Sequence, residues 1–308
     1  MRKQLAQTVL ACFFVYVVWG TTYPAIRLML APPGGEGLPL FLATGGRLLI
    51  SGVALLIVGQ FSRQGRSATR HLTRKQVSAA TCAGFLLCFG TAALVATAAQ
   101  RLPAGAVASY MATAPIWAVL MTSAVTRSLP RLHVTLGLLL GLAGVITLTG
   151  STASSDRIGV SCALAGAGTW AFGSWYTSHT PNFPPHIWIS GGIGQLTSGI
   201  ALIGVAISRS EPLHLPLPHA STPSLLAFAY LAGVSLAGLT AYSWLLRNRN
   251  PLVATTHAFI NPLVAVCVGV IVLSEGLSLR LLLSAGMVGI GAFLAMTTAR
   301  MPRRLQKS

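Results

Sequence analysis

The sequence has 308 residues, of which 53% are hydrophobic and 8% are charged. Soluble domains carry about 25% charged residues, so this composition excludes a water-soluble globular protein. The 21 Lys and Arg residues outnumber the 4 Asp and Glu residues and give a net charge of +17, whose meaning depends on where these charges lie along the chain.

Apolar segments with few or no charges recur along the whole chain. A helix that crosses a bilayer needs about 20 mainly apolar residues, and the charge-free segment 158–208 is long enough for two such helices. We therefore predict an all-α integral membrane protein with ten transmembrane helices. In chain order the expected spans are 5–30, 39–60, 76–98, 103–126, 132–150, 158–178, 185–207, 223–246, 251–273 and 279–299.

The first span starts after Arg2-Lys3, as a signal peptide would, but it lacks a small-x-small cleavage site, so we interpret it as a membrane span. The five cysteines all fall inside expected spans, without C-x-x-C spacing or clustered histidines. This pattern predicts no disulfide framework and no metal site. We also expect no cofactor.

The basic residues gather on one side of the expected membrane. With ten spans, 15 of the 21 Lys and Arg residues fall on the side that holds both termini, and all four acids fall on the other. The positive-inside rule then places both termini in the cytoplasm, for a multi-pass protein of the bacterial inner membrane. The basic segment 61–75 contains a single Phe and a single Gly, and it lacks the repeated interleaving of aromatic residues or glycines that is typical of RNA-binding tails. The expected partners are therefore membrane lipids and a small-molecule substrate, not nucleic acid; the oligomeric state is left open.

Similar segments recur at an offset of 147 residues. Ser51-Gly-Val-Ala-Leu-Leu-Ile resembles Ser198-Gly-Ile-Ala-Leu-Ile-Gly, and the same offset relates Pro115 to Pro262. Gly144 and Gly291 are also 147 residues apart. This predicts two five-helix repeats, 1–151 and 158–300, followed by a basic cytoplasmic tail, 301–308. Because each repeat has an odd number of spans, the second is inverted, an arrangement typical of secondary transporters.

Ionisable groups are scarce at membrane depth. No Asp or Glu lies in the middle of a span, which leaves Arg47 in the second span and His257 in the ninth. Buried ionisable groups in membranes usually mark function. For His257 a hydrogen bond to a neighbouring helix is the alternative. For Arg47 we favour a structural or gating role, bonded to backbone carbonyls or extended toward the interface, and a functional role is the alternative.

Two prolines lie near the expected midplane. Pro115 is twelve residues from the start of the fourth span, and Pro262 is eleven from the start of the ninth. Each proline removes a backbone hydrogen bond and frees the carbonyl four residues earlier, which then needs a partner or a wet cavity. We therefore assign both prolines a structural or gating role.

Polar and aromatic faces flank these prolines. Tyr110, Thr113 and Trp117 share one helix face, and His257 and Asn261 share another. We predict that both faces line a central substrate pathway.

The first and sixth spans carry comparable stripes. Trp19 and Thr22 lie in the first span and Trp170 in the sixth, and we include all three in the predicted substrate site. Packing against neighbouring helices is the alternative interpretation of both tryptophans, since this is a common role of membrane aromatic residues.

Several of these residues form motifs whose order is informative. They are Trp19-Gly20-Thr21-Thr22-Tyr23, Arg47-Leu48, Asn261-Pro262-Leu263-Val264-Ala265-Val266 and Leu273-Ser274-Glu275. Over essentially its whole length the chain resembles the EamA-type members of the drug/metabolite transporter superfamily. The resemblance implies export of small metabolites or drugs by alternating access, and it marks Glu275 as a motif residue for gating. The first half departs from the pattern, because Thr126-Arg127-Ser128 stands where a Glu is expected.

A secondary transporter is therefore the leading hypothesis. The absence of buried acids favours uncharged, zwitterionic or anionic substrates, including amino-acid-like compounds. The alternative is an intramembrane serine hydrolase, in which Ser235 of a Gly-x-Ser sequence would be the nucleophile and His257 the base. A channel would need a continuous polar lining, which the scattered polar residues do not provide.

Overall fold

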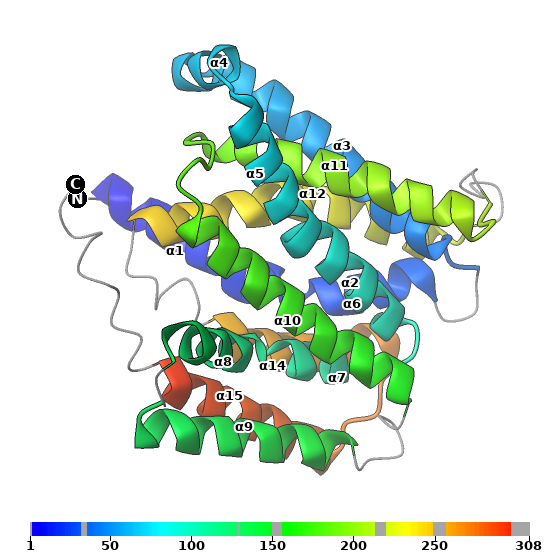
Figure 1. Ribbon diagram of the computed structural model, residues 1–308. Helices are drawn as coiled ribbons and strands as arrows, with labels where there is room; N and C mark the ends of the chain where they lie inside the picture. The colour runs from blue at the N-terminus through cyan, green and yellow to red at the C-terminus, as the bar shows by residue number, and fades with distance from the viewer. Residues whose placement is uncertain are drawn as a thin grey trace.

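The computed structural model describes residues 2–31, 36–127, 130–149, 156–212, 220–248 and 257–296. Within these ranges the regular structure is helical, apart from one isolated bridge between Glu36 and Ala220. The helices lie across one another in a single bundle (Figure 1). This confirms the predicted all-α architecture.

The first half begins with a bent span made of three helices. It consists of α1 (Arg2–Phe13), the π-helix η1 (Phe14–Val18) and α2 (Thr22–Leu30). The following helices are α3 (Leu40–Phe61), α4 (Arg63–Arg70), α5 (Arg74–Gly84), the π-helix η2 (Phe85–Gly90), α6 (Thr91–Ala99), α7 (Ala104–Met111), α8 (Ala114–Thr126) and α9 (Leu132–Thr149).

The second half has longer, less interrupted helices. They are α10 (Arg157–His179), α11 (Ile187–Ser208), α12 (Thr222–Asn248), α14 (His257–Leu273) and α15 (Leu279–Met296). Five segments of the described chain are long and apolar enough to cross a membrane, and the bent first span makes a sixth. The shorter apolar helices 132–147, 260–273 and 279–291, together with the 23-residue α10, complete the ten expected spans.

Two spans break near their centres, and hydroxyl groups cover the exposed backbone. In the first span the axis bends by 44° between Val18 and Thr22. There Thr21 Oγ1 donates to Val18 O at 2.7 Å and Thr22 Oγ1 donates to Trp19 O at 2.6 Å. Such side-chain bonds replace the backbone bonds that are lost at a break in a membrane helix.

The fourth span breaks at its proline, whereas the described part of the ninth span is one continuous helix. Helix α7 ends at Met111 and α8 restarts at Ala114, with Pro115 in its first turn, where no backbone N–H is needed. Thr113 Oγ1 donates a hydrogen bond to the carbonyl oxygen of Tyr110 at 2.7 Å. Pro262, by contrast, lies inside the continuous helix α14.

Contacts between α3 and α11 obey a two-fold symmetry. A Cβ atom at Gly45 would lie 2.9 Å from Gly199 O, and one at Gly192 would lie 3.1 Å from Gly52 O. The repeat offset of 147 relates Gly45 to Gly192 and Gly52 to Gly199. The two close approaches are therefore images of each other.

The pair α9 and α15 repeats this behaviour at the opposite edge of the bundle (Figure 1). A Cβ atom at Gly291 would lie 2.5 Å from Gly137 O, and one at Gly144 would lie 3.0 Å from Ser284 O. The same offset converts the first contact into the second. Small residues permit this close packing, and the exchange of contacts is what two inverted repeats require.

Apart from α4, which lies beyond the end of α3, the other helices lie largely between these two edges (Figure 1). Helix α10 packs on α6 and α8, while α2 and η1 of the first span pack on α12 and α14. Because the first span corresponds to α10 in the repeat, these contacts are also related by the two-fold symmetry. The arrangement brings the first, fourth, sixth, eighth and ninth spans together between the two packed edges.

Candidate functional site

An aromatic cluster forms where the first, sixth, eighth and ninth spans meet. It consists of Trp19, Trp170, Tyr242 and His257. The Trp19 ring centroid lies 5.4 Å from that of Trp170, 5.3 Å from that of Tyr242 and 5.3 Å from that of His257. Tyr242 also contacts Trp170 at 5.6 Å and His257 at 5.7 Å. Trp19 and Tyr242 each contact the other three rings and together form the centre of the cluster.

The break in the first span positions Trp19. The residue follows η1, and its indole lies over Gly238 of α12, where an added Cβ atom would overlap Nε1. A larger residue at position 238 would therefore have to displace the Trp19 ring. Thr22, one turn along the same span, is bound to the Trp19 carbonyl through its hydroxyl.

Asn261 holds the π-helical turn beside this cluster. The hydrogen-bond network assigns its amide nitrogen to the carbonyl oxygens of Tyr16 at 2.8 Å and Val15 at 3.2 Å. These carbonyls belong to η1, whose wider turn alters the regular helical bonding pattern. The side chain of Asn261 is 4% exposed. It ties α14 to the first span.

Tyr110 and Trp117 lie apart from the aromatic cluster. Tyr110 is fully buried in the main core, and its hydroxyl has no partner among the described residues. Trp117 is 38% exposed and packs over Gly168 of α10. Of the predicted site residues, Trp19, Thr22, Trp170 and His257 lie together. Asn261 lies beside them and contacts the backbone of the first span.

Tyr242 and Gly238 belong to this region but were not predicted. Both lie in the eighth span, whose polar residues show no stripe of the kind that singled out the first and sixth spans. The four-residue spacing between Gly238 and Tyr242 was the available signal, since it places a gap and a ring on one helix face.

Arg47 lies in a second polar cluster, formed by α3, α11 and α12. Its Nη1 donates to Ser235 Oγ at 2.7 Å, and Gln195 Nε2 donates to the Ser235 carbonyl at 2.9 Å. Ser235 Oγ in turn donates to Leu231 O at 2.8 Å. Nearby, Ser51 Oγ donates to Ala232 O at 2.7 Å. The Ser235 hydroxyl is therefore engaged with Arg47, which gives the hydrolase alternative no support.

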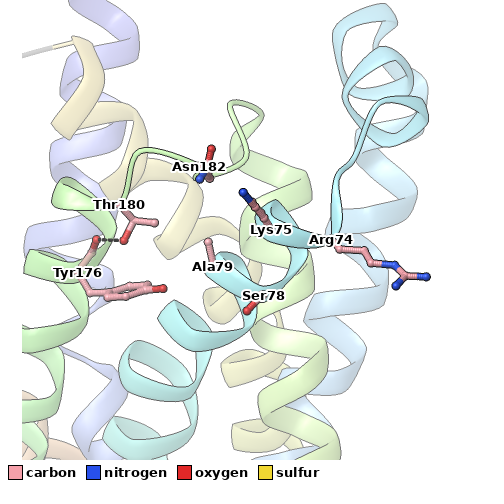
Figure 2. A pocket seen from close by; sticks show the side chains of 7 residues that line it. All are labelled: Arg74, Lys75, Ser78, Ala79, Tyr176, Thr180 and Asn182. Carbon is pink, nitrogen blue, oxygen red and sulfur yellow. Dashed lines mark hydrogen bonds between the residues drawn. The ribbon is translucent and has the colours of Figure 1, made fainter.

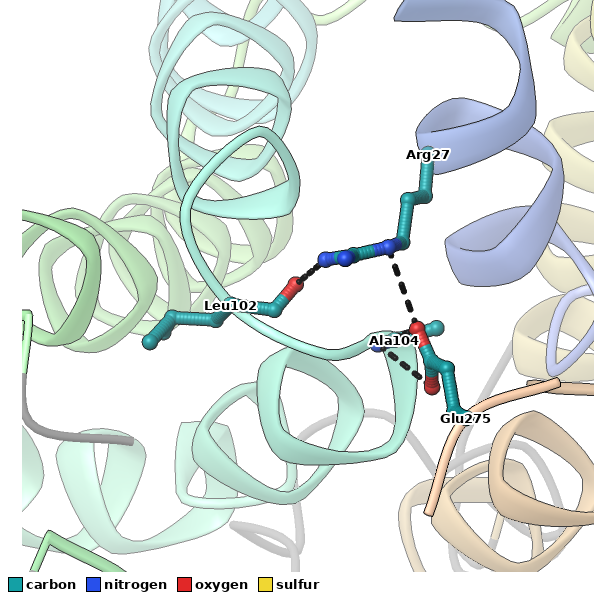
Figure 3. Close-up of polar contacts among 4 residues, drawn as sticks. All are labelled: Arg27, Leu102, Ala104 and Glu275. Atoms are coloured by element: carbon teal, nitrogen blue, oxygen red, sulfur yellow. Dashed lines mark hydrogen bonds and ion pairs between the residues drawn. The ribbon is translucent and has the colours of Figure 1, made fainter. Parts of the chain in front are cut away.

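Glu275 joins three spans at one end of the bundle, as Figure 3 shows. Its Oε1 lies 3.2 Å from Arg27 Nε, and its carboxylate accepts from the Ala104 N–H at 3.0 and 3.1 Å. Arg27 Nη1 also donates to Leu102 O. We call these four residues the latch. It connects α2, the start of α7 and the segment after α14.

Two more acids bind at the same end, which we call the acidic end. Glu211 accepts from the backbone N–H groups of Phe41 and Leu42, both at 3.0 Å, at the start of α3. Asp156 lies 3.0 Å from Arg101 Nη1 and accepts from Gly159 N at 2.7 Å. The Gly159 N–H and the Arg101 guanidinium hold the pKa of Asp156 below its ordinary value.

The opposite end, the basic end, has cations without acids. It carries Arg63, Arg66, Arg70, Arg74 and Lys75, and none of the four acids of the sequence. A pocket of about 410 Å³ opens there between α5 and the end of α10 (Figure 2). Its lining residues are Arg74, Lys75, Ser78, Ala79, Tyr176, Thr180 and Asn182.

The family model described as "EamA-like transporter family" matches the chain twice, at residues 6–150 and 157–297. The chain belongs to this family. It is 32% identical over 269 residues to the uncharacterized inner membrane transporter YedA of Escherichia coli K12, which covers 87% of this chain and 83% of YedA. The proteins of the same name in E. coli strains O6:H1 and O157:H7 match equally well.

A solved crystal structure of another protein shares the fold of this EamA-like chain. The match has a TM-score of 0.62, covers 96% of this chain and 99% of the other, and shows 18% sequence identity. The family membership makes the chain a membrane transporter and not an enzyme. The two matched copies also account for the exchange of contacts between α3 and α11 and between α9 and α15.

Proposed function

We propose that the protein is a secondary transporter that exports small metabolites or drugs across the bacterial inner membrane by alternating access. The observation that carries this proposal is the two-fold exchange of contacts between the halves. A fold whose halves are images of each other has a second conformation available, in which the two halves exchange their roles. Substrate would then meet one side of the membrane at a time.

The basic end faces the cytoplasm in this proposal. It carries the cationic residues of α4 and the start of α5, as the positive-inside rule requires. The relative named as an inner membrane transporter supports the same membrane. The pocket at the basic end would then open to the cytoplasm, where an exported substrate enters (Figure 2).

The latch closes the acidic end. To open it, α2, α7 and the segment holding Glu275 must separate, which breaks the contacts of Arg27 and Ala104 with the carboxylate. The side chain of Glu275 is 11% exposed, so breaking its ion pair and hydrogen bonds costs more than for a surface pair. The repeat offset maps Glu275 to Ser128, which lies outside the described residues and has no carboxylate.

The aromatic cluster is the proposed substrate site. Trp19, Trp170 and Tyr242 offer apolar ring faces, and His257 and the Thr22 hydroxyl offer polar groups. Asn261 would position η1 beside it. We further propose that Tyr110 and Trp117, on either side of the break at Pro115, contact substrate when α7 and α8 move.

Transport by the purified protein tests this proposal. Compounds whose cellular levels differ between cells with and without the protein would be assayed for flux in proteoliposomes. We expect Trp170→Ala to lose flux, because the cluster loses a wall, and Phe172→Ala, two residues away on α10 and 42% exposed, to retain it. Equal flux in wild type and Trp170→Ala would contradict the proposed site.

A further inference from the structure

Arg47 is a buried cation whose hydrogen-bonding capacity is largely unused. The residue is 8% exposed, and Nη1 contacts Ser235 Oγ. Its Nε has no partner among the described residues. A buried guanidinium with a single hydrogen-bond partner is costly, because most of the lost hydration is not replaced.

No acidic side chain of this protein is placed to neutralise Arg47. The sequence has four acids, and three of them bind groups at the acidic end: Asp156, Glu211 and Glu275. The fourth, Glu36, is exposed outside the helices. The charge of Arg47 is therefore uncompensated by any carboxylate side chain of the chain.

Other buried polar atoms beside Arg47 also lack partners. Thr44 lies one turn away on α3, is fully buried and has an unpartnered Oγ1. Gln195 of α11 is 2% exposed, and its Oε1 is unpartnered. Buried polar groups in native proteins are nearly always bonded. Three of the unpartnered buried atoms belong to Arg47, to Thr44 one turn away, and to Gln195, which shares Ser235 with Arg47, and a bound ligand would supply their missing partners.

One face of α12 connects Arg47 with the aromatic cluster. Ser235, which binds Arg47, is three residues from Gly238, which lies under Trp19, and seven residues from Tyr242. Residues at these spacings share a helix face, and seven residues rise about 10.5 Å along the axis. A single small molecule is long enough to reach both regions.

We infer that Arg47 is the anion-binding residue of the substrate site and that the substrates are small organic carboxylates with an apolar or aromatic portion. The carboxylate binds the Arg47 guanidinium, with the Thr44 hydroxyl as a second donor, and the apolar portion lies in the aromatic cluster. The inference rests on the proposed transport function and specifies its substrate class.

Three probes of equal length test the charge preference: 4-phenylbutyrate, 4-phenylbutan-1-ol and 4-phenylbutylamine. Binding to the purified protein in lipid nanodiscs would be followed by tryptophan fluorescence and by the shift in Tm. A charge-assisted hydrogen bond in a buried site favours the carboxylate by about 10- to 100-fold over the alcohol. Equal binding of acid and alcohol to the wild type, or preference for the amine, would overturn the inference without any variant.

Variants then assign the preference to Arg47. We expect Arg47→Gln to bind the acid as weakly as the alcohol, and Arg66→Gln, which removes an exposed Arg of α4, to behave as wild type. An acid preference that survives in Arg47→Gln would overturn the inference. If wild type binds acid and alcohol equally and Trp19→Ala loses both, the aromatic site stands and the role of Arg47 falls. If no probe binds the wild type, the inferred substrate class is contradicted, while the flux assay with Trp170→Ala separately decides the proposed transport site.

Discussion

The acidic and basic ends of the bundle are held in different ways, although the two halves of the chain are related by symmetry. At the acidic end, one carboxylate connects α2, α7 and the segment after α14. Two others accept hydrogen bonds from backbone N–H groups at the starts of α3 and α10. At the basic end the sequence provides cations and no acid. In the proposed alternating-access cycle, symmetry would make two conformations available, and the distribution of the four acids would decide which end is closed.

The largest effect on flux is expected at the aromatic cluster, which is the proposed substrate site between the two ends. Gly238→Ala places a methyl group against the Trp19 indole and displaces the ring, so flux should fall by about tenfold or more, comparable to other steric errors at a binding site. Gly233→Ala, on the same helix with no atom within 4 Å of the added Cβ, is the control and should transport normally. Normal flux in Gly238→Ala would show that Trp19 is not part of the substrate site.

Glu275→Gln should abolish the difference between the ends. The substitution removes the ion pair with Arg27 and weakens the bond from the Ala104 N–H, a loss of about 1–3 kcal/mol. In a cysteine-free background, Val266→Cys reports on opening of the acidic end. Val266 is only 4% exposed because it packs against Gly105 of α7, so a cysteine there can be labelled only when the helices separate. Its maleimide labelling rate should rise by about tenfold.

Glu36→Gln is the matched control for this change. Glu36 is an exposed acid of the same end, with no hydrogen bond or ion pair from its carboxylate among the described residues. Labelling of Val266→Cys should be unchanged by it. An equal increase with Glu36→Gln would show that net charge, and not the latch, holds the acidic end closed.

Ser128→Glu tests whether a carboxylate can also close the basic end. It places a carboxylate at the position that the repeat offset relates to Glu275. We expect it to favour closure of the basic end and to lower flux by about three- to tenfold, corresponding to a coupling of about 1 kcal/mol. Ser128→Gln is the neutral control, and equal flux in both variants would argue against a symmetric latch.

The smallest effect concerns Asp156. Since its pKa is lower in the folded protein, its contribution to stability is present above the ordinary aspartate pKa and is lost as the pH falls through the lowered value, below about pH 4. Between pH 5 and pH 3, the Tm of wild type should therefore fall slightly more than that of Asp156→Asn. Parallel pH profiles would show that the contacts with Arg101 and Gly159 contribute nothing measurable.

Much of the architecture was predictable because it depends on local patterns. Apolar segment length indicates the spans, the offset of 147 indicates the symmetry, and Pro115 indicates a break at the fourth span. Pro262 did not break its helix, although it has the same intrinsic effect on the backbone. The π-helical turn η1 was not predicted, since nothing in its sequence distinguishes it from ordinary helix.

The site was only partly predictable because it depends on contacts between distant residues. Trp19 and Trp170 were identified from their depth, but their contact with Tyr242 depends on how α12 crosses the first span. The pairing of Arg27 with Glu275 joins residues 248 positions apart. No spacing in the sequence indicates that partnership, even though Glu275 was assigned a gating role.

Reciprocal accessibility of the two ends tests the account most directly. In nanodiscs, the labelling rates of Val266→Cys at the acidic end and Ser78→Cys in the basic-end pocket would be compared with and without Glu275→Gln. Alternating access predicts fast labelling at Ser78→Cys and slow labelling at Val266→Cys, with Glu275→Gln raising the second rate and lowering the first. Labelling rates that rise together at both ends, or that do not change with Glu275→Gln, would contradict alternating access.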